Sequence, residues 1–190
     1  MPDHSNNAMT PFGEIHLPSK DYDEIKDFSS TKAVDAEHKK RWFIHEMAHV
    51  WQYFAMGISV ACRGVSLAIK GGYDKKHKSG RLMAYAYDLL GADARKEFKD
   101  FNIEQQADII CHYYLVQYER QFVLRTPAFN YLLSEQANRK YILREFLVNP
   151  TNKKLKSEQQ GFNNTDENIK NFKRAIQDKF YRKGPNFYSL

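Results

Sequence analysis

Residues 36–56 read AEHKKRWFIHEMAHVWQYFAM, without a glycine or a proline. A run of this length that ends at Gly57 predicts a long α-helix starting at Asp35 or Ala36. The centre of the helix is apolar on almost every side, so we expect it to be buried. Its strongly polar residues gather on one side, and these are His45, Glu46, His49 and Gln52.

Five residues of this helix, His45 to His49, form the pattern HExxH. Histidines four positions apart lie one turn apart on the same face, about 40° from each other, close enough to bind one zinc ion. Glu46 is placed to take a proton from a water molecule on that ion. The alternative is a pair of core histidines with other partners. A metal would satisfy all these buried polar groups together, so we predict a zinc site.

A catalytic zinc site takes a third protein ligand and leaves a fourth position for water. The metzincin pattern HExxHxxGxxH would place glycine at position 52 and histidine at position 55. The chain has Gln52 and Ala55 there, which excludes that class. The third ligand must therefore come from another segment.

A second helix is predicted from Asn102, which can cap it in a capping box with Gln105. Glu104 falls on the apolar face of this helix and Asp108 flanks it; a carboxylate at such a position is costly unless paired. We therefore predict Glu104 as the third ligand and Asp108 as the acceptor for the free ring N–H of a zinc-binding histidine. The alternative is an exposed first helical turn. The expected buried positions are Ala107, Ile110, Cys111, Tyr114, Leu115, Tyr118 and Phe122, and the competing ligands are His77, Asp88 and Asp93.

We expect a mainly α (α+β) fold, a helical zincin-like domain with a small N-terminal β element. Residues 1–12 are predicted to be a flexible arm, residues 13–150 the zinc metallopeptidase-like domain, and residues 151–190 a polar linker and an amphipathic helix packed on that domain. Alternation predicts a short strand at 13–17. Residues 58–70 and 82–90 are ambiguous between helix and strand, and residues 127–147 predict one or two further helices.

Composition narrows the class of protein. The 190 residues are 42% hydrophobic, enough for one buried core. The net charge of +6 is spread along the chain, so no nucleic-acid partner is expected. Cys62 and Cys111 form no CxxC pair, which predicts a fold independent of disulfides. We expect no transmembrane segment and no signal peptide, and hence a cytoplasmic protein in the producing cell whose secretion would use another route.

Three segments carry a resemblance to known families: FIHEMAHVWQ at 43–52, Tyr-x-Tyr at 85–87 and FNIEQQADII at 101–110. HExxH followed by a distant ExxxD resembles the gluzincin peptidases, in which the first glutamate is the general base and the later one a ligand. The longer pattern, over about residues 13–120, resembles zinc metallopeptidase domains associated with bacterial Rhs and VgrG proteins of type VI secretion. This resemblance implies a secreted effector or toxin, with a secretion-apparatus partner and an immunity protein.

The expected function is hydrolysis of peptide bonds in a protein or peptide by a zinc-activated water, with Glu46 as general base. Such enzymes place a Tyr, His or Arg to stabilise the oxyanion. Tyr85 and Tyr87 are the candidates, with core packing as the alternative for both, and His112 could also approach the site. Two other functions stay open: an amidase or endopeptidase acting on peptidoglycan peptides, and a catalytically silent, zinc-stabilised interaction module of a secretion apparatus.

Overall fold

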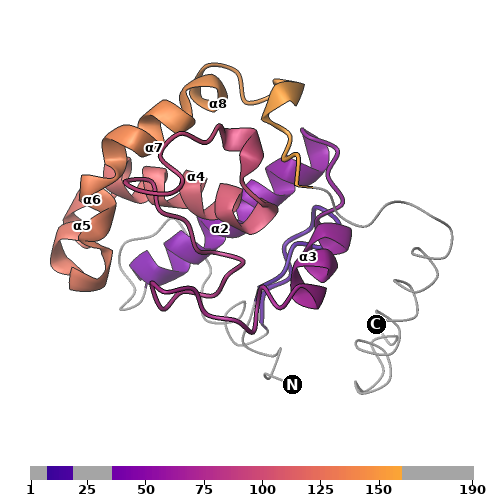
Figure 1. Ribbon diagram of the computed structural model, residues 1–190, viewed down its shortest axis with the longest axis horizontal. Helices are drawn as coiled ribbons and strands as arrows, with labels where there is room; N and C mark the ends of the chain where they lie inside the picture. Colours follow the sequence, from indigo (N-terminus) through magenta and orange to yellow (C-terminus); the bar gives the residue numbers. More distant parts are fainter. Residues whose placement is uncertain (1–7, 19–35, 160–190) are drawn as a thin grey trace, which may run out of the picture.

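The computed structural model describes residues 8–18 and 36–159, and this part of the chain is mainly helical without a sheet (Figure 1). The predicted mainly α fold is confirmed. The amphipathic helix expected near the C-terminus lies outside the described residues. The helices are α2 (Ala36–Phe54), α3 (Val60–Ile69), α4 (Ile103–Tyr118), α5 (Arg120–Arg125), α6 (Tyr131–Ser134), α7 (Gln136–Ile142) and α8 (Arg144–Val148), with 3-10 turns at Phe98–Asp100, Pro127–Phe129 and Lys153–Leu155.

Helices α2 and α4 pack against each other at the centre of the fold (Figure 1). The predicted capping box of α4 is present: Asn102 Oδ1 accepts hydrogen bonds from the backbone N–H groups of Glu104 and Gln105, both at 2.9 Å. The Gln105 side chain accepts the return bond from Asn102 N at 3.1 Å. These bonds satisfy the free N–H groups of the first turn and fix where α4 begins. Glu104 thereby lies in the first turn, next to α2.

Helix α4 is buried on more sides than its periodicity predicts. It packs against α2 and also against α6 and α7, so that Ile109, His112 and Val116 are buried as well. On the expected face, Ala107, Cys111 and Leu115 are buried, whereas Ile110 and Tyr114 are only half-buried. Tyr118, expected to be buried, is 67% exposed. The helix also ends at Tyr118, because the backbone of Glu119 leaves helical geometry, and Phe122 lies on α5 instead. The Glu119 carboxylate forms an ion pair with Lys40 of α2 at 2.7 Å.

The polar side of α2 faces inward. His45, Glu46 and His49 are buried, whereas Met47 and Phe54 are exposed. The expectation that the apolar residues of this helix are buried all round is therefore wrong for these two side chains. Buried polar groups require hydrogen-bond or metal partners, and α4 supplies them.

Three short segments differ from their predictions or settle an ambiguity. Residues 60–69 are helical, with the Ser59 side chain accepting from Cys62 N at the N-terminus of α3. Residues 82–90 form neither a strand nor a helix: Leu82 makes one antiparallel bridge with Lys76, and the rest is turns and irregular backbone. The strand expected at 13–17 is reduced to one antiparallel bridge between Met9 and His16, because the chain reverses through Gly13 at φ 84°.

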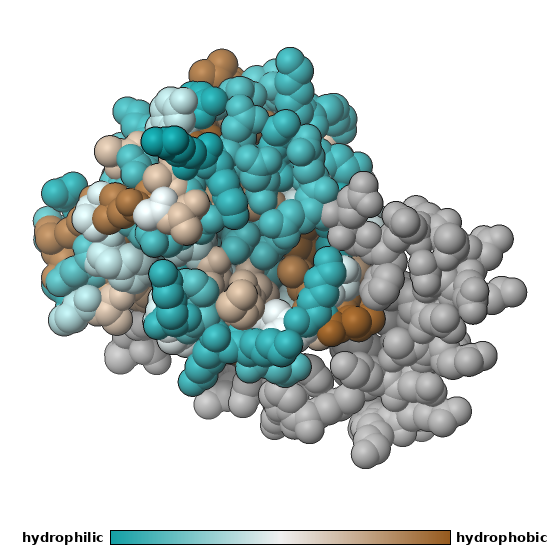
Figure 2. Space-filling model, viewed as in Figure 1, coloured by the Kyte–Doolittle hydropathy of each residue, from teal (hydrophilic) through white to brown (hydrophobic). Residues whose placement is uncertain are grey.

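Apolar side chains from distant segments form the core. One cluster includes Met56, Leu89, Phe101 and Leu143, and a second, around α5, includes Leu115. Most residues on the face seen in Figure 2 are hydrophilic. Among the helices of the described residues, none is both long and apolar enough to cross a bilayer. Both cysteines are free thiols, as predicted.

Candidate metal centre

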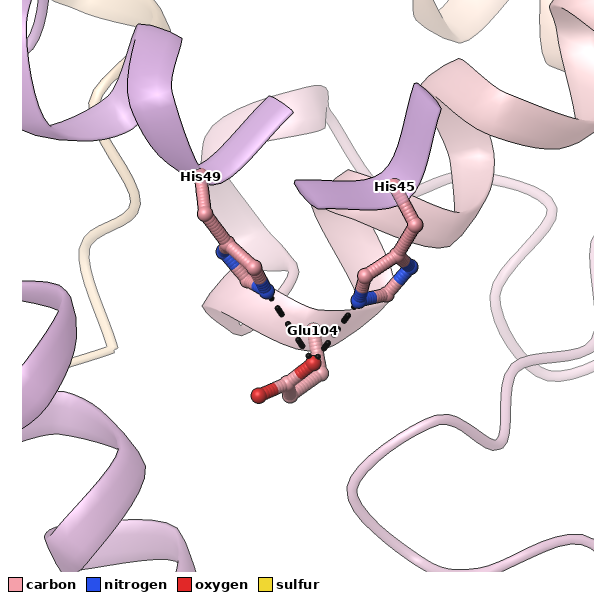
Figure 3. Close-up of side chains that lie close together, drawn as sticks. All are labelled: His45, His49 and Glu104. Atoms are coloured by element: carbon pink, nitrogen blue, oxygen red, sulfur yellow. Dashed lines mark hydrogen bonds and ion pairs between the residues drawn. The ribbon is translucent and has the colours of Figure 1, made fainter. Parts of the chain in front are cut away.

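Helices α2 and α4 bring three side chains together at one point (Figure 3). The Nε2 atoms of His45 and His49 lie 3.1 and 3.3 Å from the same oxygen of Glu104, Oε2. The candidate ligand atoms of the three residues all lie within 4.8 Å of one another. In a tetrahedral zinc site with bonds of about 2.0–2.1 Å, ligand atoms stand about 3.3–3.4 Å apart. The two nitrogen–oxygen separations fit that spacing.

The second nitrogen of each ring is occupied by an acceptor. His45 Nδ1 donates to Asp108 Oδ1 at 2.9 Å, and His49 Nδ1 donates to Gln52 Oε1 at 2.7 Å. In the neutral form of either ring, the proton on Nδ1 leaves an unshared pair on Nε2. Both unshared pairs then face the Glu104 carboxylate, which is also an acceptor. Three acceptors that converge without a donor require a cation, and two imidazoles with one carboxylate are a donor set that zinc accepts.

The shifted pKa values of His45 and Glu104 also indicate that this site favours a positive charge beside the carboxylate. Burial alone would lower the pKa of His45, but hydrogen bonds to Asp108 and Glu104 outweigh it and raise this pKa to about 10. Burial alone would raise the pKa of Glu104, yet the His49 charge and the hydrogen bonds to both rings hold it well below its usual value. The site therefore favours a carboxylate beside a cation, whether protons or a metal supply the positive charge.

Arginine side chains hold Asp108 in turn. Arg81 donates to Asp108 Oδ2, and the Arg41 guanidinium lies 3.9 Å from Oδ1. Burial would raise the pKa of Asp108, but hydrogen bonding and the nearby positive charges lower it, so the side chain stays ionised. A permanently ionised Asp108 keeps the His45 ring in one orientation.

Tyr73 occupies the second oxygen of Glu104. Its hydroxyl donates to Oε1 at 2.6 Å, while Oε2 faces the two histidines. The carboxylate thus presents a single oxygen to the centre. A ligand that binds through one oxygen leaves room for water or substrate at the fourth position of a zinc ion.

Glu46, the expected general base, is buried beside the N-terminal turn. Thr10 donates its hydroxyl proton to Glu46 Oε2 at 2.7 Å. The turn is held against α3 by a hydrogen bond from Ala61 N to the carbonyl of Pro11. One carboxylate oxygen of Glu46 is therefore engaged, and the other has no hydrogen-bond partner among the described residues.

The structure separates the predicted tyrosines. Tyr85 is half-buried with its ring centroid 6.0 Å from that of His45. Tyr87 is buried, and its hydroxyl is hydrogen-bonded to His112 Nδ1. The guanidinium carbon of Arg81 lies over the Tyr87 ring, 4.8 Å from its centroid. His112, the other candidate, is fully buried beside Tyr87, and burial lowers its pKa.

The competing ligands make other contacts. His77 hydrogen-bonds to Ser79 within its loop, Asp93 pairs with Lys96, and Asp88 accepts from the backbone of residue 90. Among the described residues, the group placed to hold a metal consists of His45, His49 and Glu104, without any of these three.

Sequence reasoning missed three side chains of the site: Thr10, Tyr73 and Arg81. Arg81 lies at the end of the loop that begins at Gly71, and Thr10 precedes the expected strand. Each reaches the site through the path of a loop, which leaves no periodic signal in the sequence. The only available hint was the pair Gly71–Gly72, whose turn accepts a hydrogen bond from Ala84 N and brings the two ends of the loop together.

The sequence is similar to a bacterial secretion protein. Over 112 residues, 59% of this chain, it is 32% identical to the type VI secretion system spike protein VgrG2b of Pseudomonas aeruginosa. The chain spans about 9% of the length of that protein. No family model matches the chain, and no solved structure matches it. The similarity is thus to one segment of a much longer spike protein.

Proposed function

We propose that this chain is a zinc-dependent metallopeptidase in which His45, His49 and Glu104 hold the metal. The observation that carries the proposal is the convergence of two ring nitrogens on one buried carboxylate oxygen, at 3.1 and 3.3 Å. Zinc bound by this set would polarise a scissile carbonyl and lower the pKa of its water towards about 7.

The chain's own residues supply the proton transfers. Glu46 follows the first ligand histidine directly, and its free oxygen would accept the proton of the attacking water and deliver it to the leaving amine. Tyr85, beside His45, is the better placed of the two tyrosines to donate a hydrogen bond to an oxyanion. Burial raises the pKa of the Tyr85 hydroxyl, so it would retain the proton that this role requires.

The biological setting we propose is type VI secretion in a bacterium, which the similarity to VgrG2b supports. The chain would act on a protein or peptide after delivery from the cytoplasm of the producing cell by the secretion apparatus. A toxin of this kind would also need an immunity protein in that cell.

Two measurements test the activity. Elemental mass spectrometry of the purified protein should find about one zinc per chain, lost in His45→Ala and in Glu104→Ala. The zinc-loaded parent should cleave members of a mixed peptide library, and zinc-loaded Glu46→Gln should cleave them about 10²–10⁴-fold more slowly. Equal cleavage by Glu46→Gln and the parent would refute the mechanism. Peptidoglycan fragments in the same assay, followed by their mass shifts, test the amidase alternative.

The burial of Glu46 favours one second candidate, a zinc-stabilised interaction module without turnover. Glu46 is 5% exposed, and Thr10 occupies one of its oxygens. For such a module, a chelator should lower the melting temperature while no substrate is cleaved by parent or Glu46→Gln. Cleavage by the parent that depends on Glu46 would exclude this candidate.

A further inference from the structure

Gln52 of α2 and Gln106 of α4 form a pair of amides behind the metal centre, both 0% exposed. One terminal atom of Gln52 lies 2.7 Å from His49 Nδ1, and the other lies 3.0 Å from the carbonyl of Ile103 and 3.1 Å from Gln106. The far atom of Gln106 lies 2.9 and 3.2 Å from the carbonyls of Phe98 and Leu155. A continuous chain of hydrogen bonds therefore connects His49 to three backbone carbonyls.

Those carbonyls determine which way each amide points. A backbone carbonyl only accepts, so the Gln106 atom between two carbonyls must be its NH2 group, and its oxygen must accept. The Gln52 atom that contacts Ile103 O and the Gln106 oxygen must likewise be NH2. The oxygen of Gln52 is then the atom at His49. Because that oxygen only accepts, His49 must carry a proton on Nδ1.

We propose that Gln52 and Gln106 are positioning residues that fix the tautomer of His49, holding its Nε2 unshared pair towards Glu104. The inference rests on the proposed zinc site, since an unprotonated Nε2 is what a zinc ligand needs. The opposite tautomer would set the Nδ1 unshared pair against the Gln52 oxygen and place a proton where the metal binds. Gln52 is the neutral counterpart of Asp108, which does the same for His45.

The anchors of this chain are spread over the fold. Ile103 begins α4, Phe98 lies in the 3-10 turn before it, and Leu155 lies in the turn at 153–155. Rotating either amide would leave buried donors facing donors and carbonyls facing oxygens, and buried polar groups without partners destabilise a fold. Gln52 is therefore held in one orientation before any metal binds.

The first test uses zinc alone, with its affinity measured by competition against a chromophoric chelator. Gln52→Met keeps the volume of the side chain but removes the acceptor, and should weaken zinc binding about 10–100-fold. The control is Asn138→Leu, which removes an amide on α7 whose hydrogen bond goes to the carbonyl of Leu89 instead. It should leave zinc affinity unchanged even if it lowers the melting temperature. Equal affinity of parent and Gln52→Met would overturn the inference while leaving the zinc site intact.

The second test needs no variant and so does not depend on Gln52→Met folding. Long-range proton–nitrogen correlation spectra of the metal-free parent, labelled at histidine and recorded at alkaline pH, report which nitrogen of His49 carries the proton. A proton on Nδ1 is expected, and a proton on Nε2 would overturn the inference. A parent that binds no zinc would refute the proposed function, and these spectra would still decide the orientation of the amides separately.

Discussion

Arg81 donates a hydrogen bond to one oxygen of Asp108 while the other oxygen of Asp108 accepts from His45 Nδ1. The loop that ends at Arg81 is thereby connected to His45, a candidate metal ligand, through a single buried carboxylate. A hydrogen bond to a charged group stabilises a fold by about 1.5–3 kcal/mol, and outer partners of metal ligands are worth about 10–100-fold in affinity. The position of this loop should therefore affect both the metal affinity of the site and the stability of the fold.

Arg81→Leu is expected to lower the free energy of unfolding by about 1.5–3 kcal/mol and to weaken zinc binding about 10–100-fold. The reason is that Asp108 keeps its charge and loses its closest cation. Urea unfolding and chelator competition measure the two effects. Arg81→Lys, which keeps the charge, should recover part of both. An Arg81→Leu protein with parental zinc affinity would show that Asp108 orients His45 unaided.

Replacing Tyr73 or Tyr85 by phenylalanine is predicted to affect two different properties, zinc affinity for Tyr73 and the rate of peptide cleavage for Tyr85. Tyr73→Phe frees Glu104 Oε1 and should weaken zinc binding about tenfold, because Glu104 is then no longer held as a one-oxygen ligand. Tyr85→Phe should leave zinc affinity unchanged and slow peptide cleavage, because its hydroxyl is expected to act on the substrate alone. Chelator competition and peptide cleavage, run on both variants, separate the two roles. Unchanged cleavage by Tyr85→Phe would show that Tyr85 only packs beside the site and does not act on the substrate.

The metal-free protein should lose stability as the pH rises above neutrality. The folded pKa of His45 is raised from 6.5 to about 10, so its contribution is fully present below pH 6.5 and is lost as the pH rises towards 10. The lowered pKa of Glu104 has the opposite effect. The stability that the Glu104 carboxylate contributes is present above its ordinary pKa of 4.5 and is lost as the pH falls below that value. This cluster is therefore most stabilising between about pH 4.5 and 6.5.

Urea unfolding of the metal-free parent at pH 6.5, 8 and 9.5 would measure this trend, with His45→Gln as the control. The free energy of unfolding of His45→Gln should change less with pH than that of the parent, because the variant lacks the titrating ring. Zinc-loaded protein should show the opposite trend over the same range, since zinc binds the unprotonated rings. A metal-free parent that gains stability from pH 6.5 to 9.5 relative to His45→Gln would contradict the assignment.

How much of the site could be predicted depended on whether a residue's position follows from helix geometry. His45, Glu46 and His49 share a face through their spacing alone, and the capping box at Asn102 predicted where α4 starts, and hence the placement of Glu104 and Asp108. Tyr73 and Arg81 reach the same site from a loop whose path is set by long-range contacts. The burial of Tyr118 was mispredicted for a related reason: periodicity indicates a face, whereas the neighbouring helices determine how far along the helix that face is covered.

The two cysteines should differ sharply in reactivity. Cys62 on α3 is partly exposed, whereas Cys111 on α4 is fully buried and donates to the carbonyl of Arg41. Burial raises the pKa of the Cys111 thiol, which suppresses the reactive thiolate. Iodoacetamide should therefore modify Cys62 in the folded protein and both cysteines in urea, as counted by intact mass. Rapid modification of Cys111 under native conditions would show that α4 separates from α2, and with it Glu104 from the two histidines.

Gly13 is expected to be intolerant of a side chain, and its replacement tests how firmly the N-terminal turn covers Glu46. Its φ of 84° is unfavourable for other residues, and an added Cβ would lie 2.6 Å from a ring carbon of Tyr53 and 2.7 Å from one of Phe54. Gly13→Ala should therefore lower the free energy of unfolding by about 1–2 kcal/mol or shift the turn. A shifted turn would withdraw Thr10 from Glu46.

Thr10→Val removes the same hydrogen bond without the backbone strain and serves as the matched variant. If the turn restricts access to the base, both variants should cleave peptides faster than the parent at equal zinc content. If Thr10 instead orients Glu46 for catalysis, both should cleave more slowly, and Thr10→Ser should retain parental activity because it keeps the hydroxyl. Parental rates in both variants would show that the contact between Thr10 and Glu46 serves stability alone.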